Sequence, residues 1–463
     1  MVFSSFIFLF AFLPVFLGIY YLAPAKLKSP VILAGSYVFY AWWRIDFLFL
    51  FAGVTIWNYL ISKQVIKQHK SWLVVGIAGN LLVLGLFKYF NFGVDSINAV
   101  LEQSGLNTIE ALRFILPIGI SFHAFQSISF LMDMYRKDAQ QPKNFWDFAA
   151  YNSLFPQMIA GPVVRYKELA DQFTQREHSL DLFSRGAYRF MQGFAKKVLI
   201  ADTVAVLVDA CFALDNPSMG DAWLGAMAYT VQLYFDFTGY SDMAIGLALM
   251  MGFKFPENFD HPYISRSITE FWRRWHITLS NWLRDYLYIP LGGNRVGKIR
   301  TLFNLFITML LGGLWHGANW TFVLWGAWHG AWLTIEKALN IQTRPSMSGA
   351  LWRVVPTFLI VVLGWVMFRS ENIHQALQFY QAMFGFGEPG ISEPMRWQIS
   401  KMALTAMGIG LVLVFIVPVW EKKNGKIREK QTFWPQVMAM LLFLLAVTKL
   451  SYQSYSPFLY FQF

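Results

Sequence analysis

The sequence predicts an all-α membrane protein: a polytopic bundle of about ten to twelve transmembrane helices with re-entrant and interfacial amphipathic helices. Of the 463 residues, 56% are hydrophobic and 14% are charged, and the mean hydropathy is +0.41. Such a chain carries more apolar surface than a soluble globule needs. Its 19 Trp and 20 Tyr residues suit membrane interfaces. An aromatic-rich soluble core is the competing interpretation, but many stretches reach spanning length.

The charge and cysteine content narrow the classes of function. There are 38 Lys and Arg residues against 27 Asp and Glu, giving a net charge of +11. The basic residues fall in short loops between apolar segments, which favours orientation in a lipid bilayer over nucleic-acid binding. The single cysteine, Cys211, excludes an intramolecular disulfide and a cysteine-based metal cluster. We expect neither a metal ion nor a bound cofactor.

Stretches that suit membrane crossing follow one another along the whole chain, so we expect one domain over residues 1–463. Residues 5–23 lack the basic start and cleavage motif of a signal peptide, and they are therefore expected to form the first crossing. The further stretches are 30–62, 72–90, 112–131, 190–213, 223–252, 302–336, 351–368, 401–420 and 433–449. We expect 30–62 to be broken near Arg44 and Asp46, and 302–336 to hold two crossings. Basic loops after every second crossing predict that the N-terminus lies outside.

Two segments do not fit simple crossings. The apolar segment 145–164 is interrupted by Pro156, Gly161 and Pro162, which favours a re-entrant segment buried among other helices. Segment 266–295 has apolar residues at helical spacing along one side and basic residues on the other. This pattern predicts an amphipathic helix at the cytoplasmic interface.

His316 is the most informative ionisable residue, because it lies in the apolar motif LLGGLWHGANW and polar groups inside a membrane are costly. Gly312 and Gly313 precede it by about one helical turn. They could leave room for a substrate to approach the imidazole. They could equally serve close helix packing, with His316 as a hydrogen-bonding contact between helices. Both interpretations remain open from the residues alone.

The other histidines give weaker signals. His276 falls at the border of the predicted amphipathic helix, where an interfacial residue without a catalytic role is favoured over one facing a cavity. His329 follows His316 by 13 residues, which is roughly 220° around one continuous helix. The two cannot share a face unless the chain turns between them. We expect His329 and His123 to be packing or hydrogen-bonding residues.

Asp236 and Tyr240 lie one turn apart in the apolar segment QLYFDFTGYSDMAIGLALMMGF, which also contains Asp242. Structural pairing with Arg or His of a neighbouring helix is favoured, and lining of a polar channel is the alternative. The sequence has no P-loop, dinucleotide fingerprint, HExxH or GxSxG motif. Phosphoryl transfer, hydride transfer and serine-esterase chemistry therefore have no support.

Three motifs, YFDFTGYSDMAIG, FWRRWHITLSNWLRDYLYIPLGG and GGLWHGANW, resemble the membrane-bound O-acyltransferase family in this order. The resemblance is greatest to its bacterial alginate O-acetyltransferase branch and extends to about residue 337. It implies that His316 is the catalytic histidine and His276 the second residue of the pair. We expect the substrate channel or donor site to include Trp275, Arg273, Arg274, Asn281, Asp236, Tyr240 and Asn319.

The resemblance further implies transfer of an acetyl or other acyl group across the bacterial inner membrane. The donor is expected to be a cytoplasmic thioester, either acetyl-CoA or an acyl-carrier protein, and the acceptor an exported polysaccharide, with alginate favoured. Periplasmic polysaccharide acetyltransferase partners are expected, and nucleic acid is not. Transfer of D-alanine or another acyl group to a different surface polymer is the alternative. A transporter or flippase is the rival class, although inverted repeats are not apparent.

Overall fold

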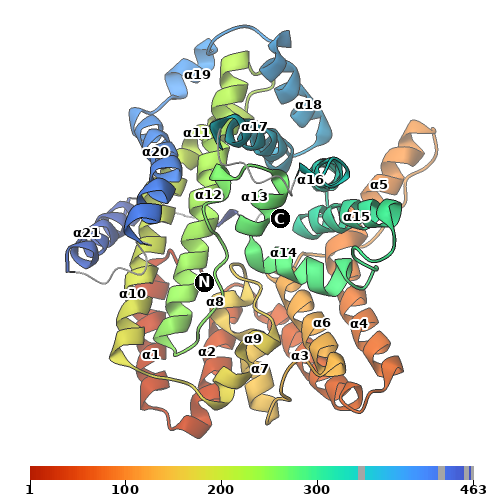
Figure 1. The fold of residues 1–463 in the computed structure, drawn as a ribbon, viewed down its shortest axis with the longest axis vertical. Helices are drawn as coiled ribbons and strands as arrows, with labels where there is room; N and C mark the ends of the chain where they lie inside the picture. The colour runs from red at the N-terminus through yellow and green to blue at the C-terminus, as the bar shows by residue number, and fades with distance from the viewer. Residues whose placement is uncertain (342–349, 426–432, 453–457, 460–463) are drawn as a thin grey trace. The chain divides into compact units, whose positions relative to one another are not determined.

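The computed structural model describes residues 1–341, 350–425, 433–452 and 458–459, and all their regular secondary structure is helical (Figure 1). The chain divides into two compact units. The first contains Met1–Phe183 and Leu247–Pro256, and the second contains Ser184–Gly246 and Glu257–Phe463. The predicted all-helical class is confirmed.

The first unit is built from nine α-helices of the described residues. Its helices are α1 (Leu13–Leu22), α2 (Lys28–Ala41), α3 (Ile45–Val65), α4 (Lys70–Leu84), α5 (Phe90–Gln103), α6 (Ile120–Arg136), α7 (Phe145–Ser153), α8 (Phe155–Met158) and α9 (Tyr166–Thr174). A π-helical turn, Phe8–Phe12, leads into α1, and another, Gly85–Tyr89, joins α4 to α5. Between α2 and α3 the helix is interrupted just before Arg44, whose Nε lies 2.9 Å from Asp46 Oδ1, so the predicted break is confirmed.

Polar side chains inside the first unit are paired with one another. Asn58 of α3 and Asn80 of α4 exchange amide hydrogen bonds of 2.7 and 3.0 Å. His123 of α6 is 4% exposed, and its Nε2 lies 2.9 Å from Asn152 Nδ2. Buried polar groups must be hydrogen-bonded inside an apolar bundle, and these pairs hold α3, α4, α6 and α7 in register.

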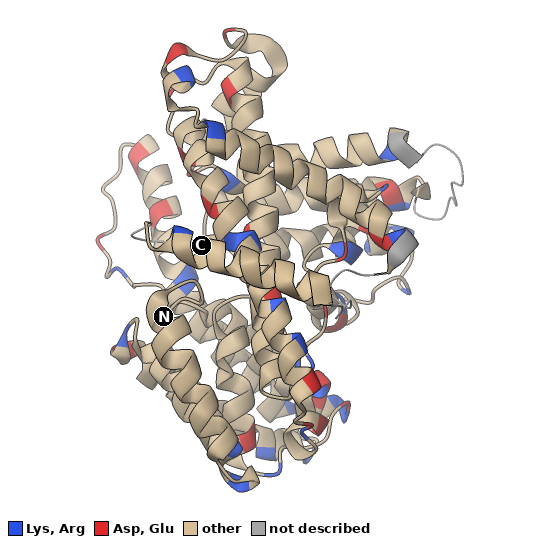
Figure 2. Cartoon of the chain, turned by 90° about the vertical axis from the view of Figure 1, so that its left-hand side faces the viewer, with Lys and Arg blue, Asp and Glu red and all other residues tan. Residues whose placement is uncertain are grey.

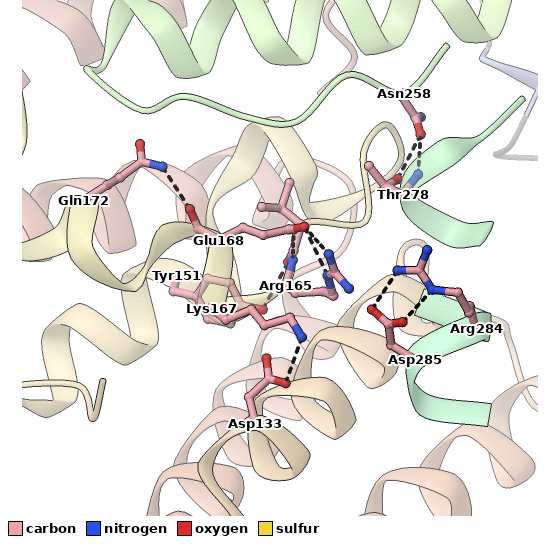
Figure 3. A network of polar contacts seen from close by, with 11 residues as sticks. Asp133, Tyr151, Arg165, Lys167, Glu168, Gln172, Asn258, Thr278, Arg284 and Asp285 are labelled. Carbon is pink, nitrogen blue, oxygen red and sulfur yellow. Dashed lines mark hydrogen bonds and ion pairs between the residues drawn. The ribbon is translucent and has the colours of Figure 1, made fainter. Parts of the chain in front are cut away.

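Segment 145–164 is not one straight helix. Its helical parts, α7 and α8, are separated at Leu154, and an irregular stretch follows Met158. Ionic and polar contacts fix the next residues: Arg165 Nε lies 3.1 Å from Glu168 Oε1, and Lys167 Nζ lies 3.8 Å from Asp133 Oδ1 (Figure 3). The predicted interruption is therefore present, with residues on both sides of it buried.

The second unit contains the remaining α-helices of the described residues, including the longest one, α12. They are α10 (Leu180–Ala195), α11 (Asp202–Phe212), α12 (Met219–Met250), α13 (Ile268–Arg274), α14 (Ile277–Leu283), α15 (Lys298–His316), α16 (Trp320–Ala338), α17 (Ala350–Arg369), α18 (Ile373–Gln381), α19 (Glu393–Gln398), α20 (Lys401–Asn424) and α21 (Phe433–Leu450). π-Helical turns follow α10, α14 and α18, and α10 begins and α12 ends within the first unit.

Five helices of the described residues are long and apolar enough to cross a membrane: Ile45–Val65, Lys70–Gln103, Trp352–Arg369, Lys401–Lys422 and Phe433–Leu450. The helix Phe8–Leu22 is apolar but shorter. Charged residues gather towards the ends of helices and in loops, and long helical stretches carry none (Figure 2). Because a lipid environment penalises charge along a spanning helix, this distribution is that of a multi-pass membrane protein.

Two predicted elements differ from the structure. Segment 266–295 is not a continuous amphipathic helix, because α13 ends at Arg274 and α14 begins at Ile277. In the predicted crossing 112–131, the helix begins only at Ile120, after Pro117 and the left-handed Gly119. Proline disfavours the helical conformation of the residue before it, so the part of the stretch that precedes Pro117 does not continue into α6.

Candidate active site

His316 is the last residue of α15. The helix ends there because Gly317 is extended, and α16 starts three residues later behind Asn319, whose Oδ1 accepts a 3.0 Å hydrogen bond from the Thr321 amide. Asn319 also donates to the Glu371 carbonyl at 2.8 Å. The chain therefore turns between His316 and His329, so the two helices of 302–336 are confirmed and the 220° separation does not apply. Asn319 is an N-cap in this position.

Gly313, three residues before His316, lets α15 and α16 approach each other closely. A Cβ atom on Gly313 would overlap the carbonyl oxygen of Phe322 and lie 2.8 Å from the Cα of Gly326. A Cβ on Gly312 would lie 3.1 Å from a terminal methyl of Leu283, which can move. Gly313 thus serves close helix packing, one of the two open interpretations. This packing fixes the end of α15 against α16, seen side by side in Figure 1, and so fixes His316.

His276 lies at the break between α13 and α14 and adopts a left-handed conformation with φ of +42°. Hydrogen bonds from a preceding loop produce the break: the Asp260 amide donates to the Arg274 carbonyl, and the Ile277 amide donates to the Asn258 carbonyl, both at 2.9 Å. The imidazole is 0% exposed. The expected interfacial position is therefore wrong, because these tertiary hydrogen bonds end α13 and turn His276 inwards.

Asn258 holds the ring of His276. Its Oδ1 lies 3.1 Å from His276 Nδ1 and accepts a 2.8 Å hydrogen bond from Thr278 Oγ1, drawn in Figure 3. Its Nδ2 donates to Ser241 Oγ at 3.1 Å, which settles the orientation of the amide. Because a carboxamide oxygen only accepts, the network assigns the proton of neutral His276 to Nδ1 and the lone pair to Nε2. No motif in the sequence pointed to Asn258.

The two imidazoles lie next to each other inside an aromatic enclosure. The ring centroids of His276 and His316 are 6.3 Å apart. His316 is 4% exposed, and its ring contacts those of Trp315, Trp325 and Phe368 at centroid distances of 5.0, 5.1 and 5.3 Å. Residues 40 positions apart in the sequence are thus brought together where the low dielectric strengthens polar interactions.

Trp275 and Arg274, two other predicted site residues, have different roles. Trp275 is buried, with ring centroids of Phe259 and Trp365 both 5.0 Å away. Arg274 forms an ion pair of 2.8 Å with Glu270, one turn earlier in α13. Arg274 therefore stabilises α13, whereas Trp275 forms part of the aromatic lining.

Arg273 and Asn281 lie on the outer sides of these short helices. Arg273 is exposed at the end of α13, and Asn281 is half-buried in α14. Neither side chain is placed by the structure next to the two imidazoles.

Asp236 and Tyr240 of α12 make packing and pairing contacts with neighbouring parts of the second unit. Lys197 Nζ lies 2.8 Å from Asp236 Oδ1, and the Leu459 amide donates to Asp236 Oδ2 at 3.0 Å. The ring of Tyr240 stacks on Phe458 with a centroid distance of 4.3 Å. Pairing of Asp236 is thus with Lys instead of the expected Arg or His.

The neighbouring Asp242 does pair as expected. Its Oδ1 lies 2.8 Å from Arg189 NH2, and its Oδ2 lies 2.6 Å from Lys196 Nζ. Buried charges need such partners, and these pairs join α12 to α10 and to the turn that follows it.

His329 of α16 is completely buried, and its Nδ1 accepts a 3.3 Å hydrogen bond from Trp272 Nε1. The ring of Trp325 lies 5.0 Å from it. His329 is thus a hydrogen-bonded member of the aromatic cluster. Among the residues that the structure describes, no three or more His, Cys, Asp or Glu side chains are grouped to hold a metal ion.

A multi-pass helical membrane protein that encloses two neighbouring imidazoles has the arrangement of an intramembrane acid–base enzyme. The model of the membrane-bound O-acyltransferase family matches residues 112–377, a range that contains both histidines. The chain belongs to this family and is an O-acyltransferase.

Three relatives match over most of the chain. The chain is 55% identical to the probable alginate O-acetylase of Pseudomonas putida, with 100% of both chains covered. It is 37% identical to the peptidoglycan O-acetyltransferase of Helicobacter pylori, with 83% of this chain and 80% of that protein covered. It is 29% identical to the teichoic acid D-alanyltransferase of Streptococcus thermophilus, with coverage of 71% and 82%.

Proposed function

We propose that this protein transfers an acetyl group from a cytoplasmic thioester towards exported alginate at the bacterial inner membrane. The similarity to alginate O-acetylases over the whole chain carries this proposal. Relatives that act on peptidoglycan or teichoic acid match at lower identity over a smaller part of the chain. Acetyl-CoA or an acyl-carrier protein is the proposed donor, and periplasmic acetyltransferases are the proposed partners.

His316 is the proposed general base. An imidazole titrates near neutral pH, so it can accept the proton of an attacking hydroxyl or thiol and later return it to the leaving thiolate. Its position at the end of α15, fixed by the Gly313 contact with α16, holds it in one place while the substrates change. A positioned acid–base group contributes about 10² to 10⁴ in rate.

His276 is proposed to orient the reacting groups beside His316. Because Asn258 fixes its proton on Nδ1, Nε2 presents a lone pair and can accept a hydrogen bond from a substrate hydroxyl. The ring separation of 6.3 Å lets one substrate group contact both imidazoles. The hydrogen bond to Asn258 orders the ring of His276 better than packing alone would.

The donor is proposed to arrive from the side that carries the basic residues around 254–300. Arg273, Arg295, Lys298 and Arg300 are exposed. Exposed guanidinium and ammonium groups bind phosphate oxygens, which both coenzyme A and a phosphopantetheine carrier supply. A passage from this surface to His316 is part of the proposal.

The test uses an alginate-producing host that lacks its own alginate acetylase. Wild-type protein should restore O-acetyl esters on the secreted polymer, measured per uronic acid. His316→Ala should lower the acetyl content by at least about 10²-fold at equal membrane abundance. His69 is an exposed loop residue. His69→Ala therefore serves as the matched control and should behave as wild type. Full acetylation by His316→Ala would overturn the assignment of the base.

A further inference from the structure

The indole of Trp325 has an unusual hydrogen-bonding state. Trp325 lies in α16 and is 1% exposed, and its Nε1 has no hydrogen-bond partner among the residues that the structure describes. An indole nitrogen can only donate. A buried donor left without an acceptor weakens the fold, so this position calls for an explanation.

Other tryptophans of the second unit satisfy the same group. The indole of Trp272 donates to His329 Nδ1, that of Trp365 to the Tyr263 hydroxyl at 3.1 Å, and that of Trp328 to the Ile360 carbonyl at 3.0 Å. Trp328 is on the same helix as Trp325, less than one turn further along. The second unit thus supplies an acceptor to each of these three indoles, whereas Trp325 Nε1 has none among the described residues.

Trp325 is one of the indoles in direct contact with the proposed base, and Trp315 is another. Its ring meets His316 edge to face, with centroids 5.1 Å apart and planes at 89°, and it contacts Phe368 at 5.0 Å. Trp365 stacks on it at 5.8 Å with planes at 19°. These contacts fix the indole in the enclosure, so its N–H is a preorganised donor in a region without bulk water.

The proposed chemistry lacks such a donor. When a hydroxyl or thiol attacks a thioester, the new bond to the carbonyl carbon forms as the C=O electron pair moves onto oxygen. His316 takes the proton of the attacking group, and His276 presents a lone pair through Nε2, so neither of these two nitrogen atoms donates to the new oxyanion. Preorganised donors at such an oxygen supply a large part of the rate in acyl transfer.

We propose that Trp325 Nε1–H donates the hydrogen bond that stabilises the oxyanion of the acyl group. This inference rests on the proposed function. On collapse of the intermediate, the oxygen electron pair re-forms the C=O bond, the C–S bond breaks, and the thiolate receives the proton held by His316. Trp325 is then a catalytic residue, because it contacts the reacting oxygen.

The test replaces Trp325 by β-(3-benzothienyl)alanine, in which sulfur stands in place of the indole N–H and the ring shape is kept. The same substitution at Trp328, whose N–H is bonded to a backbone carbonyl, is the matched control. Both variants are produced in the acetylase-deficient host at low expression, where polymer acetylation is proportional to the amount of protein. Membrane abundance and thermal unfolding in detergent are measured alongside.

The expected result is a loss of about 10²- to 10³-fold for the Trp325 variant, as for removal of one oxyanion donor, with unchanged abundance. The Trp328 variant should lose stability and keep its acetylation per molecule. Wild-type acetylation by the Trp325 variant would overturn the inference alone, and so would equal losses in both variants. Failure of the wild-type protein to acetylate alginate would overturn the proposed function as well.

Discussion

Asn258→Ala should lower acetyl transfer by about 10- to 100-fold without removing the protein from the membrane. The change deletes the acceptor 3.1 Å from His276 Nδ1 and leaves both histidines in place. In the altered protein the imidazole can rotate, or carry its proton on Nε2, and in either state it loses the lone pair that it presents to the substrate. The variant therefore tests the orientation of His276 apart from its presence.

The magnitude follows from one buried hydrogen bond. Leaving a buried donor without its acceptor costs about 1 to 3 kcal/mol, and each ~1.4 kcal/mol of barrier is a tenfold change in rate. If this free energy is lost only from the correctly oriented state of the imidazole, the rate of acetyl transfer falls about 5- to 150-fold. This range includes the expected decrease. Thr278 also loses the acceptor of its hydroxyl, a bond of 2.8 Å, so the free energy of unfolding should fall as well.

Asn304→Ala separates these two effects. Asn304 and Asn258 are both buried, at 0% and 1% exposed. Asn304 Nδ2 donates to the Leu291 carbonyl at 3.0 Å, without contact to either histidine. Thermal unfolding and polymer acetylation are measured for both variants at equal membrane abundance. Both should unfold at lower temperature, and only Asn258→Ala should lose acetylation. Wild-type acetylation by Asn258→Ala, or an equal loss in Asn304→Ala, would refute the reasoning.

Further substitutions test the second histidine and the packing behind the first. His276→Ala should severely impair acetylation, measured as the ester content of the polymer, and His123→Ala and His329→Ala should reduce it less. A larger loss in His329→Ala would mean that His276 is wrongly assigned as the second histidine beside His316. Gly313→Ala should destabilise the protein by about 1 to 3 kcal/mol because its Cβ meets backbone, whereas Gly312→Ala meets a movable methyl and should cost less, as judged by thermal unfolding in detergent. Equal unfolding temperatures for the two glycine variants would contradict this account of helix packing.

Hydropathy and helix-breaking residues were sufficient for much of the fold. The interruption before Arg44, the break near Pro156 and the division of 302–336 into two helices all follow from local signals that the structure contains. The break near Pro156 follows from a missing backbone donor and a disfavoured backbone conformation, the interruption before Arg44 from charge within an apolar stretch, and the two helices of 302–336 from its length. Each of these signals can be read in a single sequence. The sequence does not predict the start of α6 at Ile120, because hydropathy does not distinguish an apolar irregular segment from an apolar helix.

The geometry of the candidate site depends on contacts that periodicity does not encode. The apolar spacing of 266–295 continues through His276 without interruption, and only the hydrogen bonds of Asn258 and Asp260 end the helix there. Family motifs pointed to His276 and His316, but the residue that orients the first imidazole lies in a loop without a recognisable pattern. Long-range backbone pairing of this kind depends on where the loop is placed by the rest of the second unit.

The strained conformation of His276 supports an active role for the break. A non-glycine residue with φ of +42° costs about 1 to 3 kcal/mol, and such residues persist where the surrounding contacts determine them. Here the Ile277 amide is bonded after the residue, the Arg274 carbonyl before it, and the Asn258 carboxamide holds its ring. In a continuous helix, His276 would follow Trp275 by about 100° and one of the two rings would leave the interior. Since the break lets both rings lie inside, 0% and 2% exposed, the strain is what places the imidazole beside His316.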